Sequence, residues 1–311
     1  MYLLEYLVSS LIIMIMVLIG VAFLTLLERK ILGYVQIRKG PNKILFKGIL
    51  QPISDALKLM SKELFLMKNL NYMIYFLSPC FSFMLMLMLW VIMPNFFNMS
   101  ISEVSILLFI CFLSLGVYMM MLSGWSSNSL YSMLGSIRAI SQSISYEVSL
   151  ILIILSSLFL IESFDMFKMA SVQDKIWASI YMWGVMLMFL VSVVAELNRT
   201  PFDLAEGESE LVSGFNTEYM AGGFVLIFLS EYGMIMLMSY LFMLFYFMVN
   251  INSISMGGSV MVMILIILFR GSFPRIRYDK LMMLIWKSFL VVILNYLVFL
   301  NFIKWILLIL Y

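Results

Sequence analysis

Residues 6 to 27 read YLVSSLIIMIMVLIGVAFLTLL and contain no charged side chain. A helix of about 20 apolar residues, rising about 1.5 Å per residue, crosses the hydrocarbon layer of a bilayer. Hydrophobic residues make up 64% of the whole chain and charged residues 12%, whereas soluble domains contain about half and about a quarter. The sequence therefore predicts an all-α integral membrane protein.

Further apolar stretches of similar length follow along the chain and predict about eight transmembrane helices in total. Single acids, Glu147 and Glu231, interrupt two of these stretches. Because every loop is shorter than an ordinary domain, residues 1–311 are interpreted as a single transmembrane domain. The expected spans are 6–27, 72–92, 104–122, 142–160, 176–195, 219–248, 255–269 and 288–303.

The cations are divided unequally between the two sides of the membrane. When loops are assigned to alternate sides, one side receives only Lys168, Lys175 and Lys304, out of 19 Lys and Arg in the chain. Cytoplasmic-type loops carry the excess of Lys and Arg. The long charged loops are therefore predicted on the cytoplasm-like face, with both termini on the opposite face.

The segment 195–218, AELNRTPFDLAEGESELVSGFNTE, holds the densest cluster of charge in the chain. Its single cation is Arg199, and its six carboxylates are Glu196, Asp203, Glu206, Glu208, Glu210 and Glu218. Like charges this close oppose one another's ionisation, so we expect some of these groups to hold protons near neutrality. The acidic loop, residues 196–218, is therefore predicted to handle protons.

The first long loop, residues 29–71, contains an amphipathic pattern. Pro52 suits a first helical turn, and apolar residues recur at helical spacing from Ile49 to Leu64, with Gln51, Asp55, Lys58 and Lys62 opposite. This pattern predicts an interfacial helix. It either anchors the loop or walls an entrance between the lipid and the charged loops. Basic segments at 28–30, 38–42 and 273–279 share a side with the acidic loop, so we expect attraction to join them in a polar cap.

Two acids lie where charge is costly. A bare acid at the bilayer centre costs about 2.5 to 3.5 kcal/mol on insertion scales, and Glu231 is predicted near the middle of its span. Glu147 is predicted about one and a half turns inside its own. Each is a protonated acid hydrogen-bonded to a neighbouring helix, a carboxylate that reaches for the interface, or a carrier of protons.

The chain lacks the residues that several classes of chemistry require. The chain has no His, and Cys80 and Cys111 lie singly in apolar spans, where we interpret them as packing residues. No metal or iron–sulfur ligand set is present, and no phosphate-binding glycine motif is found. The net charge of +2 gives no indication of nucleic acid. The 31 Met residues would follow from an organelle genetic code that reads ATA as Met.

Four segments resemble a known family over essentially the whole chain. They are LLERKILGYVQIRKGPN (26–42), SGWSSNSLYSMLGSIRAISQSISYEVSL (123–150), AELNRTPFDLAEGESELVSGFNTEY (195–219) and FPRIRYDKLMMLIWK (273–287). The chain is similar to subunit 1 of mitochondrial NADH:ubiquinone oxidoreductase, respiratory complex I. A related branch is the membrane subunit of membrane-bound hydrogenases.

The resemblance implies a core membrane subunit that forms part of the ubiquinone chamber and couples quinone reduction to proton translocation. For the chamber and its entrance it implies Arg29, Arg38, Asp55, Glu196, Arg199, Asp203, Glu206, Glu208 and Glu210. For the proton path it implies Glu147, Glu231, Glu28, Tyr146 and Tyr232.

The same resemblance implies an enzyme subunit without a redox cofactor of its own. Ubiquinone is the expected substrate, while NADH, FMN and iron–sulfur clusters belong to partner subunits. The expected partners are the matrix-arm subunits at the quinone site, adjacent membrane-arm subunits and phospholipid, with no nucleic acid. The expected location is the mitochondrial inner membrane, with the long charged loops facing the matrix.

Two other classes of function remain open from the residues alone. A secondary transporter could use Glu147, Glu196 and Glu231 as an ion relay, although no clear inverted repeat of the kind common in transporters is visible. A structural anchor for the matrix arm would use the loop charges only to dock neighbouring subunits.

Overall fold

A computed structural model of the chain describes residues 2–64, 68–94, 103–173, 176–204, 207, 214–216, 218–247 and 253–310, and in these residues all regular secondary structure is helical. Within this described part of the chain, six helical segments are long and apolar enough to cross a membrane. They are α1 (Tyr2–Val35), α3 (Tyr72–Ile92), α4 (Ser105–Ser126), α5 (Leu130–Ile161), α10 (Ala221–Tyr246) and a segment formed by α12 (Tyr278–Met283), the π-helical η3 (Leu284–Phe289) and α13 (Leu290–Leu310).

Two shorter apolar helices, α8 (Trp183–Glu196) and α11 (Ser253–Ser272), account for the remaining expected spans. The all-α membrane fold is thus confirmed in the described residues. The short elements are η1 (Phe46–Gly48), α2 (Gln51–Met60), α6 (Met166–Val172), α7 (Ala178–Tyr181) and η2 (Gly214–Asn216).

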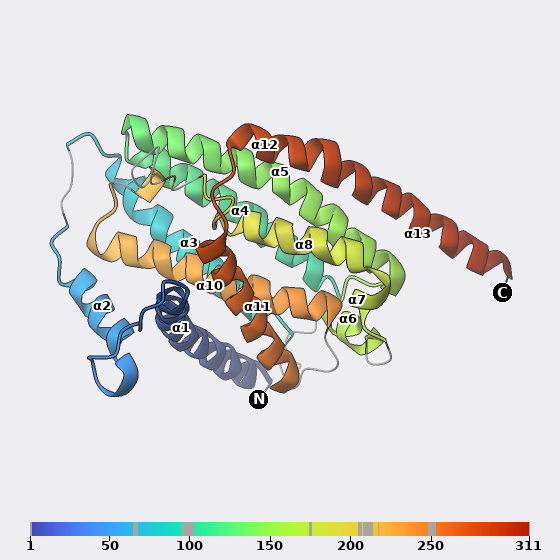
Figure 1. Ribbon diagram of the computed structural model, residues 1–311, viewed down its shortest axis with the longest axis horizontal. Helices are drawn as coiled ribbons and strands as arrows, with labels where there is room; N and C mark the ends of the chain where they lie inside the picture. Colours follow the sequence, from blue (N-terminus) through green and yellow to red (C-terminus); the bar gives the residue numbers. More distant parts are fainter. Residues whose placement is uncertain are drawn as a thin grey trace.

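Helix α10 forms the centre of the bundle. In an apolar stretch of 18 residues in α10, 61% of the residues are buried, compared with 17% in the corresponding stretch of α1. It contacts α1, α3, α8 and α11, while α5 packs against α4 and α8. Near the C-terminal end of α10, Phe242 and Tyr246 pack around Phe189 of α8. In Figure 1, α13 runs along α5 and then extends past the other helices to the C-terminus.

Two expectations about the spans and one about the cysteines are corrected. The span expected at 176–195 is two helices, because the backbone breaks at Met182 with φ −118° and ψ 29°. Helix α5 starts at Leu130, well before the expected residue 142, since its serine-rich first turns pack against α4 and need no apolar run. Cys80 and Cys111 are not packing residues, because both lie exposed on the outer surface of their helices.

The amphipathic helix expected in the first long loop is present as α2, with Pro52 in its first turn. It is shorter than expected, and Ile49 and Leu64, the two ends of the expected apolar pattern, lie outside it. None of its residues is buried, and Leu57 and Met60 are exposed. It contacts α1 and α10 at one end of the bundle (Figure 1).

Loops that are distant in sequence meet at this same end. The amide of Ile276 donates to the carbonyl of Pro201 at 2.9 Å, which joins the loop after α11 to the loop after α8. The hydroxyl of Tyr75 donates to the carbonyl of Glu218 at 2.8 Å, which ties the end of the acidic loop to α3. The charged loops are therefore held together over the ends of the helices.

Candidate functional site

The site begins where α8 ends and the chain reverses. The amides of Leu197 and Asn198 donate to the carbonyls of Val193 and Ala195, and Asn198 adopts a left-handed conformation with φ 49°. Phe202 then closes the turn by donating its amide to Arg199 at 2.8 Å. We call residues 197–204 the arginine turn. It places the side chain of Arg199 against the bundle.

Arg199 lies between two carboxylates from different helices. Its guanidinium is 3.9 Å from Glu28 of α1 and 3.9 Å from Glu231 of α10. The same group lies over the ring of Tyr232, 4.8 Å from the centroid. Arg199 is 9% exposed and Glu28 5%, and a charge this deeply buried requires a counter-charge. The structure therefore brings together four residues expected on the chamber and the proton path.

Arg270 completes this group, and its role was not predicted from the sequence. It lies in the last turn of α11 and forms a direct ion pair with Glu28. Two acids and two arginines thus balance in charge if all are ionised. The signal in the sequence was weak, because a cation just after an apolar span is also an ordinary topology signal. We call Glu28, Arg199, Glu231 and Arg270, with Tyr232, the charge network.

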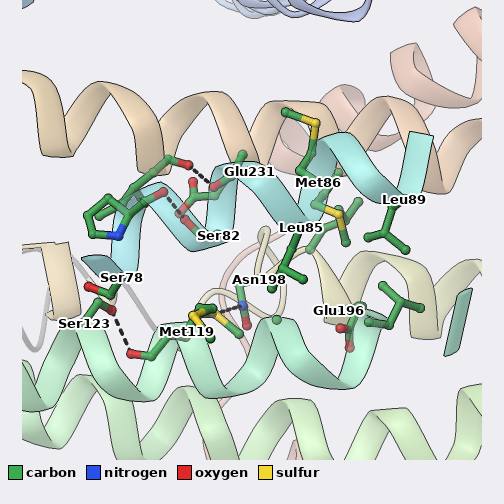
Figure 2. Close-up of a pocket in the computed structure, with 18 of the residues that line it drawn as sticks. Ser78, Ser82, Leu85, Met86, Leu89, Met119, Ser123, Glu196, Asn198 and Glu231 are labelled. Carbon is green, nitrogen blue, oxygen red and sulfur yellow. Dashed lines mark hydrogen bonds between the residues drawn. The ribbon is translucent and has the colours of Figure 1, made fainter. Parts of the chain in front are cut away.

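A cavity of about 120 Å³ adjoins the charge network between α3, α4, α10 and the arginine turn. In Figure 2, Glu231, Glu196 and Asn198 lie along this cavity, together with Ser78, Ser82 and Ser123. The other lining residues are mostly Leu and Met. Since one water needs about 10–15 Å³ of such space, the cavity has room for several water molecules beside the acids.

Glu196 and Glu147 form an acid pair next to this cavity. Glu196 ends α8, as expected, and its Oε2 atom is buried without a hydrogen-bond partner among the described residues. Glu147 on α5 is half-buried and close enough to interact electrostatically with Glu196. The neighbouring Tyr146 is fully buried, its ring 5.8 Å from that of Phe202.

Asp203, just after Phe202 in the arginine turn, faces the loop after α11. Its carboxylate lies 3.0 Å from the guanidinium of Arg275, and Asp203 is buried. Arg275 was expected only as part of a basic segment. The ion pair joins the acidic loop to the basic segment, as the expected polar cap requires.

Arg29, Arg38 and Asp55 form a separate group near α2. Arg29 pairs directly with Asp55, which also accepts a hydrogen bond from Gln51 at 3.0 Å. Arg38 is exposed and lines a basic pocket together with Arg29, Lys39 and Lys43. In the described residues, this group and the charge network both adjoin the end of α1 but have different ion partners.

The far end of the acidic loop is held by buried hydroxyl groups. Tyr219 shares hydrogen bonds with Ser78 at 3.0 Å and with Ser126 at 3.2 Å, and its ring stacks on Tyr75 with centroids 4.4 Å apart. Burial raises the pKa of Tyr219, although these two hydrogen bonds lower it in part. The expected chamber residues Glu206, Glu208 and Glu210 lie outside the described residues.

The fold and the site together define a polytopic α-helical membrane protein with a buried network of ionisable groups. Ionisable residues within membrane helices commonly mark ion, proton or substrate pathways. The comparisons with known proteins identify the family.

The model for the family described as NADH dehydrogenase matches residues 8–301. A protein named "NADH-ubiquinone oxidoreductase chain 1" from Anopheles gambiae is 51% identical over 294 residues, which cover 94% of each chain. Relatives of the same name are 50% identical in Locusta migratoria, over 94% of each chain, and 46% in Branchiostoma lanceolatum, over 92% of this chain and 91% of the relative. The chain belongs to the NADH dehydrogenase family, and the resemblance drawn from its sequence is confirmed.

Proposed function

We propose that this chain is a membrane subunit of respiratory complex I that forms part of the ubiquinone chamber and couples quinone reduction to proton translocation. Its family membership and the printed names of its relatives support this assignment. The observation that carries the coupling role is the position of Arg199, at equal distance from Glu28 and Glu231 and beside a cavity that Glu196 and Glu231 also line.

The chamber role is proposed for the residues that surround the polar end of the bundle. Ubiquinone has a long apolar tail, so it enters from lipid past the exposed apolar face of α2. Arg29, Arg38 and Asp55 stand beside this face. Glu206, Glu208 and Glu210 of the acidic loop are proposed as further residues of the chamber. Phospholipid covers the outer face of α2.

The chain's own residues do not fit a redox group. An iron–sulfur cluster uses four Cys ligands, or two Cys and two His, whereas this chain has no His and its two Cys lie on different helices. Flavin, NADH and iron–sulfur clusters therefore belong to partner subunits. These deliver two electrons to ubiquinone, which takes up two protons and leaves as ubiquinol.

The coupling step is electrostatic. Electrons that reach the quinone before its protons add negative charge near the acidic loop, which favours proton uptake by neighbouring carboxylates. Glu196 and Glu147 interact with each other, so a change at one alters the protonation of the other. Through the cavity the change reaches Glu231, where Arg199 redistributes its attraction between Glu231 and Glu28. The perturbation then passes to adjacent membrane-arm subunits.

This role places the protein in the mitochondrial inner membrane, with its long charged loops in the matrix. The high Met content fits synthesis inside the organelle. Co-purification tests the setting: partners with flavin and iron–sulfur clusters support complex I, whereas a nickel–iron partner would support the hydrogenase branch.

The coupling role is tested with Glu231→Gln in the assembled complex. We expect normal NADH oxidation by an artificial acceptor that takes electrons ahead of the quinone, together with a loss of proton translocation linked to quinone reduction. The matched control is Glu162→Gln, because Glu162 is exposed and pairs with Lys304 away from the charge network. Full proton translocation in Glu231→Gln would contradict the proposed coupling role.

A further inference from the structure

Gln142 of α5 joins the last turn of α8 to the arginine turn. Its side-chain amide donates to the carbonyl of Ala195 at 3.1 Å and to that of Phe202 at 2.8 Å. The residue is completely buried. An amide NH₂ group has two donors, and both are directed to this one segment, on either side of Arg199.

The position of Arg199 depends on where this turn lies. Its guanidinium is 3.9 Å from each of two carboxylates, which is longer than a direct hydrogen bond in both cases. A displacement of the turn by about an ångström would bring Arg199 into contact with one carboxylate and remove it from the other. The balance between Glu28 and Glu231 is therefore sensitive to the restraint on the turn.

We infer that Gln142 is a positioning residue for the coupling reaction: it fixes the arginine turn and thereby keeps Arg199 shared between Glu28 and Glu231. The inference rests on the proposed function and deepens it. Gln142 reaches Arg199 only through the backbone of the turn, so it is not a catalytic residue.

The two carbonyls that accept from Gln142 also have backbone partners. The carbonyl of Ala195 accepts a second hydrogen bond from the amide of Asn198 at 3.2 Å, and that of Phe202 accepts one from Leu204 at 3.0 Å. Both carbonyls remain bonded when the Gln142 amide is lost. Gln142→Met, which replaces the amide with an apolar group of similar length, is therefore the suitable variant.

The chain offers a matched control in Gln173. Its side-chain amide also donates to two backbone carbonyls, those of Leu244 and Phe245, both at 2.9 Å, and it is equally buried. These partners lie about 20 Å along α10 from Glu231 at the usual helical rise. Gln173→Met thus removes the same bonds away from the charge network.

The experiment measures protons translocated per electron in assembled complexes that carry Gln142→Met, Gln173→Met or Arg199→Gln, and in the double variant of Gln142 and Arg199. We expect Gln142→Met to lower the number of protons translocated per electron about two- to tenfold, because two hydrogen bonds that restrain the turn are lost. Gln173→Met should retain the wild-type ratio. In the Arg199→Gln background, Gln142→Met should add no further loss, because it acts through Arg199.

Equal additional losses in both backgrounds would overturn the inference, since they would show that Gln142 acts independently of Arg199. If Gln142→Met keeps wild-type coupling while Arg199→Gln is defective, the inference about Gln142 is overturned and the proposed function is not. Wild-type coupling in Arg199→Gln would overturn both the proposed function and this inference.

Discussion

The guanidinium of Arg199 lies 3.9 Å from the carboxylate of Glu231, inside an otherwise apolar bundle. The two residues come from different elements, the turn after α8 and the central helix α10. Arg199 is equally distant from Glu28, so two acids from different helices share this cation. A cation shared in this way can favour one acid or the other when nearby charge changes.

Arg199→Lys should impair coupling even though it keeps the positive charge. Lysine keeps the charge but has no planar fork of donors that can face two carboxylates at once and stack on the ring of Tyr232. We expect proton translocation per electron well below the wild-type value, with the complex still assembled. The measurement is proton uptake in reconstituted vesicles. Full coupling with lysine would show that charge alone is sufficient at this position.

Arg270→Gln should impair coupling by a different route. Glu28 loses its direct ion pair, so Arg199 moves toward Glu28 and leaves Glu231 with weaker pairing. We expect slower coupled turnover with unchanged NADH oxidation by an artificial acceptor. Arg277→Gln is the control, because its pair with Asp279 is largely exposed and such pairs contribute about 0–1 kcal/mol. Equal behaviour of the two variants would contradict this role for Arg270.

Tyr219→Phe should destabilise the link between the acidic loop and the bundle. The change removes a hydroxyl that bonds to Ser78 and Ser126 but keeps the ring stacked on Tyr75. Ser126 keeps its bond to the carbonyl of Ser123 at 3.0 Å, whereas Ser78 loses its hydroxyl partner, and a buried hydroxyl left unsatisfied costs about 1–3 kcal/mol. We expect a lower midpoint of thermal unfolding for the purified complex and faster proteolysis within the acidic loop. An unchanged midpoint and cleavage rate would show that these bonds contribute little.

Gly124→Ala should loosen the packing of α4 on α5. The new methyl group would overlap the side chain of Ser136 and lie 3.0 Å from the carbonyl of Ser132. Overpacking of this kind costs about 1–3 kcal/mol. Gly184→Ala in α8 is the control, since nothing lies within 4 Å of its new methyl group. Thermal unfolding should separate the two variants, and equal midpoints would contradict the close contact of α4 and α5.

Apolar composition predicted the spans well, because lipid solvation requires long uncharged helices and leaves little ambiguity. The break at Met182 was not predicted, because α7 and α8 are both apolar and the nearest glycine, Gly184, lies inside α8 rather than at the break. The start of α5 was missed because serines that face α4 resemble loop residues in composition.

Acids in the membrane were visible from the sequence, but their partners were not all identified. Glu231 was noted because a charge in an apolar stretch needs a reason. Its link to Arg199 was not predicted and became visible only in the structure. Arg270 lies 242 residues from Glu28, and no local pattern indicates such a pair. Gln142 carries no charge, so its two bonds to the arginine turn became visible only in the structure.

The central claim is that buried carboxyl groups of this chain change protonation when ubiquinone is reduced. Infrared difference spectroscopy of the assembled complex during redox turnover tests it most directly. We predict a carboxyl signal on quinone reduction that is missing or shifted in Glu231→Gln and unchanged in Glu162→Gln. Identical difference spectra for the wild type and Glu231→Gln would contradict the claim.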